Sequence, residues 1–201
     1  MAALFYPGGN IHDSSQEGYS FTHNFLSDLG GYESHSSEQN FLSNFFFNMS
    51  MFVFALVGIA FLWIPQLFRE DTLNWYLSCL GSFFLFIGTL FFAGVGLTPY
   101  DLYLDIHIFF ALNAFRLMVP GCLCFLIVLL RSNVQKRYAF IAGFYLFSVV
   151  AYVCYQLLST GNPFEDINEM IRQATIQKII VILSVISVLS FSFAFEAQIK
   201  I

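Results

Sequence analysis

Five long apolar segments follow one another along the chain after residue 40. Each is long enough to cross the hydrocarbon core of a bilayer, which takes about 20 residues of helix. The connections between the segments are short, so neighbouring helices are expected to run antiparallel. The pattern predicts an all-α integral membrane protein with transmembrane helices over residues 41–66, 74–97, 105–130, 138–158 and 174–198.

The residues before the first segment have a different pattern. Residues 1–7 are apolar but too few to span a bilayer. Pro7, Gly8 and Gly9 would end a helix there, because proline removes a donor and glycine permits sharp turns. We therefore expect residues 1–7 to be the end of a helix that starts before Met1, so that a six-helix bundle lacks its first helix. A complete five-helix protein is the alternative.

Residues 8–40 are polar, with five carboxylates, three of the four histidines and no Lys or Arg. The expected organisation is a polar loop over residues 1–40 and a transmembrane helical bundle over residues 41–201. Basic residues in short loops stay cytoplasmic, and alternate loops of this chain hold Arg69, Arg131, Lys136, Arg137 and Lys200. The sequence therefore predicts a multi-pass protein of the cell membrane with residues 8–40 extracytoplasmic and the C-terminus cytoplasmic.

Composition agrees with this class and narrows the expected partners. The chain is 58% hydrophobic and only 10% charged, whereas soluble domains have roughly 25% charged residues. The four cysteines lie inside apolar runs, so free thiols are expected instead of disulfides or zinc ligands. No basic patch suited to nucleic acid is present. Membrane lipid is the expected partner, and no cofactor is expected.

Polar side chains inside the apolar segments indicate which helix faces turn inward, because polar groups exposed to lipid are costly. Asn44 and Asn48 make one such stripe directly beneath the polar loop. In the third segment His107 lies one turn inside the outer end, and Arg116 lies nine residues further, on the opposite face. An arginine at that depth needs a partner or water. A structural role for it is as well supported as a functional one.

The stretch from His23 to Gly30 is the candidate site within the polar loop. Ser27 and Asp28 are expected to brace backbone donors while Gly30 supplies a positive φ, which makes a rigid turn. A buried Asp28 would need a partner, expected among Arg116, Asn44, Asn48 and His107. The candidate ligand-pocket residues are His23, Ser27, Asp28, Asn44, Asn48, His107 and Arg116, and the candidate turn residues are Pro7, Gly8, Gly9 and Gly30.

Two catalytic interpretations of this stretch have less support. His23, Asp28 and His107 are weak candidates for a metal site, because no His-x-x-x-His or His-Glu-x-x-His spacing brings them together along the chain. No metal is expected. Ser27 lacks the Gly-x-Ser-x-Gly elbow that presents a hydrolase nucleophile. The catalytic residues of any enzyme activity are therefore left unassigned.

The order of these motifs resembles a known family. Tyr6-Pro7-Gly8-Gly9, then Asn24 to Gly30, then the helix with Asn44 and Asn48 is similar to the bacterial and archaeal domain of unknown function 998 family. The chain also looks like the wider Frag/DRAM/Sfk group of six-helix membrane proteins, in which a later helix carries His-x-x-x-Ala with a nearby Phe. His107, Ala111 and Phe115 match that motif.

The resemblance implies a six-helix bundle, whereas it leaves the activity open. The bacterial family has no assigned activity, while the eukaryotic relatives are associated with lipid-anchor remodelling and membrane-lipid organisation. The eukaryotic Pro-Pro-Glu-Ser run is absent, with Glu33-Ser34 and Glu38 as the nearest candidates. His23 is not part of the eukaryotic pattern. Fold analogy alone does not transfer a function.

Three functional hypotheses remain from the sequence. The first is a protein that binds a lipid headgroup or small polar ligand in an outward-facing pocket. The second is a membrane-embedded hydrolase or lipid-remodelling enzyme that uses Asp28 with His23 and His107, with or without a metal. The third is a purely structural membrane protein, in which the Ser-Asp-x-Gly turn and Arg116 only stabilise the fold.

Overall fold

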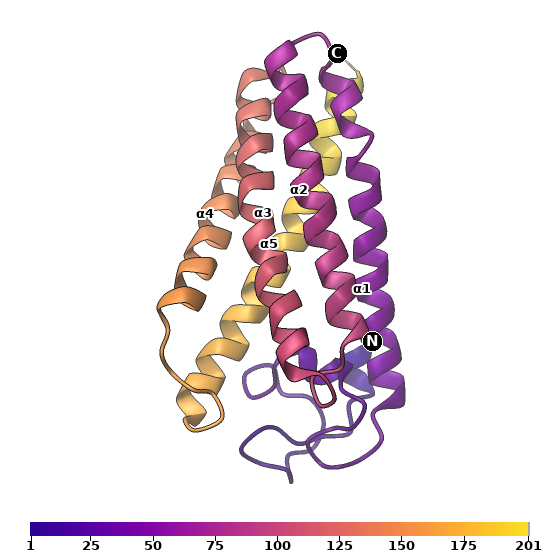
Figure 1. Ribbon diagram of the computed structural model, residues 1–201, viewed down its shortest axis with the longest axis vertical. Coiled ribbons are helices and arrows are strands. Elements are labelled where there is room, and N and C mark those ends of the chain that lie inside the picture. Colours follow the sequence, from indigo (N-terminus) through magenta and orange to yellow (C-terminus); the bar gives the residue numbers. More distant parts are fainter. Residues whose placement is uncertain (201) are drawn as a thin grey trace. The chain divides into compact units, whose positions relative to one another are not determined.

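The computed structural model describes residues 1–200, and its regular elements are all helices. Five of them are long and apolar enough to cross a membrane, which confirms the predicted fold class (Figure 1). They are α1 (Phe41–Phe61), α2 (Thr72–Leu97), α3 (Leu104–Arg131), α4 (Lys136–Leu158) and α5 (Ile167–Ile199). Three short 3₁₀ helices accompany them: η1 (Ala2–Leu4), η2 (Leu26–Gly30) and η3 (Ile64–Phe68).

Two helix boundaries differ from the predicted ones for identifiable reasons. The α-helical part of the first segment ends at Phe61, and η3 follows with Pro65 near its start. Helix α5 begins at Ile167 instead of residue 174. Asp166 caps it, because the Asp166 side chain accepts a hydrogen bond from the Asn168 main-chain nitrogen at 2.8 Å. The polar residues after Asp166 are therefore the first turns of the helix and not a loop.

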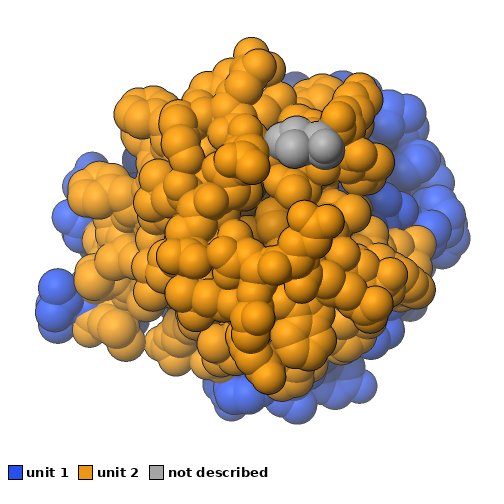
Figure 2. Space-filling model, turned by 90° about the horizontal axis from the view of Figure 1, so that it is seen from above, with its two compact units in different colours: residues 1–54, 92–111, 158–179 blue, residues 55–91, 112–157, 180–201 orange. Residues whose placement is uncertain are grey.

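The chain divides into two compact units, coloured blue and orange in Figure 2. Unit 1 consists of residues 1–54, 92–111 and 158–179, and unit 2 consists of residues 55–91, 112–157 and 180–201. Charge is distributed unevenly between them. Ten of the thirteen carboxylates belong to unit 1, and six of the eight Lys and Arg residues belong to unit 2.

The centre of unit 2 is a cluster of aromatic rings from α1, α3 and α5. The rings of Phe61, Phe125, Phe191 and Phe195 lie with centroids 5.4–6.3 Å apart. Edge and tilted ring contacts at these distances stabilise more than area burial alone. Helix α2 approaches the same cluster at Gly81, where an added Cβ would lie 3.0 Å from Phe125. A small residue is needed there because the helices pass so closely.

Unit 1 joins the polar N-terminal segment to the helices through an apolar core. Its buried members are Tyr6, Leu29, Phe47 and Val95, which come from the N-terminal segment, η2, α1 and α2. Figure 1 shows residues 1–40 in indigo and violet beside the first turns of α1 and α3. Residues 8–40 are thus tied to the helices by buried apolar contacts as well as by polar ones.

The predicted turn at Pro7, Gly8 and Gly9 is a tight antiparallel pairing with residues 16–18. Gly9 donates to the Gln16 main-chain oxygen at 2.8 Å, and the Pro7 oxygen accepts from Gly18 at 3.1 Å. Gly8 has φ 152° and Gly9 has φ 79°, conformations that favour glycine. At Gly9 an added Cβ would also lie 2.4 Å from the main-chain carbon of His35.

Gly30 differs from its prediction. Its φ is not positive, because the positive-φ glycines among residues 1–200 are Gly8, Gly9 and Gly18. Gly30 instead ends η2 where the ring of Phe47 lies against it, and an added Cβ would be 2.4 Å from Phe47 Cδ1. Glycine is therefore required by close approach and not by backbone conformation.

Gly9 and Gly18 give a matched test of how tightly residues 8–40 are packed. Both have a left-handed φ, but Gly18 has open space where a Cβ would be. We expect Gly18→Ala to cost about 1 kcal/mol of unfolding free energy from strain alone. Gly9→Ala adds the clash with residue 35 and should cost about 3 kcal/mol. Thermal unfolding of the purified variants in detergent measures both, and equal destabilisation would contradict the close packing at Gly9.

Candidate functional site

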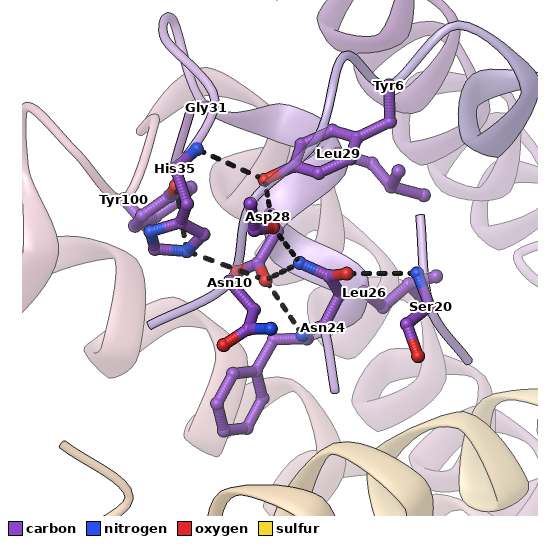
Figure 3. A network of polar contacts seen from close by, with 12 residues as sticks. Tyr6, Asn10, Ser20, Asn24, Leu26, Asp28, Leu29, Gly31, His35 and Tyr100 are labelled. Atoms are coloured by element: carbon purple, nitrogen blue, oxygen red, sulfur yellow. Dashed lines mark hydrogen bonds and ion pairs between the residues drawn. The ribbon is translucent and has the colours of Figure 1, made fainter. Parts of the chain in front are cut away.

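The side chain of Asp28 lies at the centre of a polar network inside unit 1 (Figure 3). Only 3% of the residue is exposed. Its Oδ2 atom accepts hydrogen bonds from the main-chain nitrogen of Phe25 at 2.9 Å and from Asn24 Nδ2 at 3.0 Å. The bond to Phe25 closes the first turn of η2, as a capping carboxylate does. His35 Nε2 lies 3.6 Å from the same oxygen.

Asn24 connects this carboxylate to the rest of the polar loop. Asn24 is fully buried, and its Nδ2 also donates to the Gly9 oxygen at 2.8 Å. Its Oδ1 accepts from Gln16 Nε2 at 2.8 Å and from the Ser20 main-chain nitrogen at 2.9 Å. One amide side chain therefore holds four separate parts of residues 8–28 together.

His35 forms the exposed side of the network. Its side chain is 20% exposed, against 4% for that of Asp28. His35 Nε2 lies 3.3 Å from the Tyr100 hydroxyl, and the two rings are 5.5 Å apart. The His35 main-chain nitrogen donates to the Tyr6 hydroxyl, which in turn donates to the Gly9 oxygen. We refer to Asn24, Asp28, His35 and Tyr100 as the Asp28 site.

Three phenols surround the carboxylate and are neutral at physiological pH. Burial, followed by the negative charge of Asp28, raises the pKa of Tyr6, of Tyr19 and of Tyr100. These hydroxyls can therefore donate hydrogen bonds to a ligand or to the protein but do not add negative charge.

Lys178 brings a buried positive charge to the network from α5. It is 4% exposed, and its Nζ atom donates to the main-chain oxygens of Asn24 and Ala174. Its ammonium also lies 5.4 Å from the ring centre of Tyr19 and 5.3 Å from that of Phe21, where cation–π attraction contributes. The Asn24 main chain binds Lys178 while its side chain binds Asp28, so Asn24 links the two buried charges.

The two inward asparagines of α1 hold the turn after Asp28. Asn44 Nδ2 donates to the Gly30 oxygen at 2.7 Å, and Asn48 Nδ2 donates to Asn44 Oδ1 at 2.9 Å. Asn40, just before α1, donates to the main-chain oxygens of Asp28, Leu29 and Gly31. The predicted stripe beneath the polar loop therefore contacts the backbone of this turn, and not the Asp28 carboxylate.

The predicted histidines lie in separate surroundings. His107 is buried, with Nδ1 2.6 Å from the Thr98 oxygen. His23 is half-buried, with Nδ1 near the hydroxyls of Ser20 and Thr22. Ser27 is also half-buried within η2. In residues 1–200 no three His, Cys, Asp or Glu side chains gather as metal ligands would.

The prediction for the partner of Asp28 is wrong. Arg116, Asn44, Asn48 and His107 were expected, whereas the Asp28 carboxylate contacts Asn24, the main chain of Phe25 and His35. Arg116 belongs to unit 2, where it donates to Asn113 Oδ1 at 3.4 Å. The prediction looked for partners on the helices, but the loop itself supplies them.

Asn24, His35, Tyr100 and Lys178 take part in the network but were not among the candidate site residues. Lys178 had a signal, because it is a charged residue within the apolar segment that forms α5, and ionisable residues in such segments usually face a partner. The only sequence signal for Asn24 was its place in the stretch from Asn24 to Gly30 that carries the family resemblance, because an asparagine near a turn is otherwise an ordinary loop residue.

The link between the buried charges predicts coupled stability effects. Asp28→Asn and Lys178→Met each leave the other charge without compensation, so each should cost about 3 kcal/mol of unfolding free energy. The double variant removes both charges. Its loss of unfolding free energy should be at least about 1 kcal/mol smaller than the sum of the losses in the two single variants. A double-mutant cycle from chemical unfolding in detergent measures this coupling, and strict additivity would contradict it.

Comparison with protein families matches the chain over nearly its whole length. The model of a family described as "Protein of unknown function (DUF998)" matches residues 1–194. No curated protein matches the chain, and neither does any solved structure. The match covers the Asp28 site and all but the last residues of α5.

Proposed function

The chain belongs to the DUF998 family of unknown function, and from its own geometry we propose that it binds a lipid headgroup or another small polar molecule at the Asp28 site. The protein is a multi-pass membrane protein by its five long apolar helices. The observation that carries the proposal is the partly exposed imidazole of His35, held against a buried carboxylate and the Tyr100 hydroxyl. Such a group is oriented before a ligand arrives, which lowers the entropic cost of binding.

The surroundings of the site support a ligand that comes from the membrane. Helix α1 starts next to η2, and its first turns expose Phe41 (73%), Leu42 (47%) and Phe45 (48%). Acyl chains can lie against these side chains while the headgroup reaches the polar loop. Acyl contact and headgroup contact are thus available within the same unit.

We further propose that the Asp28 site faces away from the cytoplasm. Basic loop residues stay on the cytoplasmic side, and Arg69, Arg131, Lys136, Arg137 and Lys200 all belong to unit 2. Residues 8–40 have no Lys or Arg. The headgroup bound would then be one of the outer leaflet.

Binding fits the geometry better than hydrolysis by the residues first considered. His23 contacts Ser20 and Thr22, and His107 contacts the Thr98 oxygen, so neither histidine is a partner of the Asp28 carboxylate. The nearest histidine to Asp28 is His35, and it lies next to a tyrosine. An activity that needs His23, Asp28 and His107 together has no support from these contacts.

His35 and His12 provide a matched pair for testing the proposal. His12 lies in the same polar segment but is exposed, with Nε2 2.8 Å from the Pro163 oxygen. We expect His35→Gln to reduce the lipid that copurifies with the folded protein at least tenfold, because it removes the imidazole at the entrance of the site. His12→Gln should leave the amount unchanged. Mass spectrometry of extracted lipid measures both.

Equal lipid content in the wild type and in folded His35→Gln protein would refute binding at the Asp28 site. That result would favour the purely structural interpretation, in which the network only stabilises residues 8–40.

A further inference from the structure

We propose that the Asp28 site selects a ligand with a primary amine, such as the ethanolamine headgroup of a phospholipid or free ethanolamine. This inference rests on the proposed function and specifies its ligand class. It is carried by oxygen atoms near Asp28 that have no donor, together with the charge balance of unit 1.

The Asp28 carboxylate is only partly satisfied. All its described hydrogen bonds reach Oδ2, and within residues 1–200 no donor contacts Oδ1. An ionised carboxylate can accept about four hydrogen bonds over its two oxygens. Oδ1 therefore keeps capacity to accept hydrogen bonds from a ligand donor.

Two more buried oxygens near Asp28 share this property. Asn40 is 1% exposed, and its Oδ1 has no partner among the described residues, although its Nδ2 donates to the Asp28 main-chain oxygen at 3.3 Å. The hydroxyl of Tyr19 is likewise buried without a partner in that part of the chain. Asn40 Oδ1 can only accept and so lacks a donor, whereas the Tyr19 hydroxyl can both donate and accept.

The charges of unit 1 favour recognition through a cationic group over recognition through a phosphate or carboxylate. Its two basic residues are already engaged, since Lys178 binds main-chain oxygens and Arg172 binds the Glu169 carboxylate. Ten carboxylates belong to the same unit. An anionic group would meet no available cation and would be repelled, whereas a cationic group would be attracted.

The chemistry of the ligand cation follows from the unfilled acceptors. A primary ammonium carries three N–H donors and resembles the Lys178 ammonium that the same network already holds. A quaternary ammonium carries the same charge but no donor, so Asp28 Oδ1 would gain no hydrogen bond from it. Sites built to hydrogen-bond a group strongly reject analogues that lack it.

The test compares soluble headgroups on the purified full chain in detergent. Glycerophosphoethanolamine, glycerophosphocholine, glycerophosphoglycerol and free ethanolamine are titrated separately by calorimetry. We expect glycerophosphoethanolamine to bind at least tenfold more tightly than the choline and glycerol compounds. If free ethanolamine binds as tightly as glycerophosphoethanolamine, the ligand is a free amine. If free ethanolamine binds much more weakly, the ligand is the lipid headgroup.

Variants locate the selectivity at Asp28. Asp28→Asn should lose at least tenfold in affinity for the ethanolamine compound, and Glu17→Gln, an exposed carboxylate of the same segment, should not. If Asp28→Asn does not fold, the wild type is titrated with glycerophosphoethanolamine carrying one, two or three N-methyl groups. Each added methyl group should lower the affinity, because it removes an N–H donor.

Equal binding of the ethanolamine and choline compounds would overturn the amine inference while leaving headgroup binding intact. Binding of none of the four compounds would overturn both proposals.

Discussion

A carboxylate that is almost fully removed from solvent constrains everything around it, because it needs donors and opposite charge close by. In this protein that carboxylate is Asp28, and much of residues 8–40 is arranged to meet its requirements. Asn24 orients toward it and gathers the preceding loop, while the main chain of Phe25 closes η2 onto it. The buried ammonium of Lys178 reaches the same asparagine from α5. The polar segment is therefore an ordered cap on the helices of unit 1 and not a flexible connection.

The same requirement explains how a polar site can exist beside long apolar helices. The apolar core of Tyr6, Leu29, Phe47 and Val95 holds the cap on α1 and α2, and Asn40 and Asn44 satisfy the main-chain oxygens of the turn. With the backbone satisfied, the side chains of Asp28 and His35 are kept in one arrangement. The described hydrogen bonds of the Asp28 side chain all reach Oδ2, and the proposed ligand would use the remaining capacity at Oδ1.

The sequence predicts the helices far better than the contacts of the site. Long apolar runs reveal membrane helices by length alone, whereas the start of α5 depended on the Asp166 cap, a local signal hidden among other polar residues. Asp28 was identified from the sequence because an acidic side chain in a tight turn accepts hydrogen bonds from the backbone of that turn. Its partners were not predicted, because Asn24 and His35 lie close to it in the loop but look like ordinary polar loop residues. Lys178 is distant in sequence and reaches Asn24 only through tertiary structure. Gly30 shows the same limit, because the ring of Phe47 and not its own φ requires glycine.

If the Asp28 carboxylate orders residues 8–40, hydrogen–deuterium exchange measures this order directly. Exchange is followed in wild-type protein and in Asp28→Asn under conditions where both retain their helices. We expect Asp28→Asn to speed exchange throughout residues 8–40 by at least tenfold while α2, α3 and α4 keep their protection. Unchanged protection of residues 8–40 in the variant would contradict it.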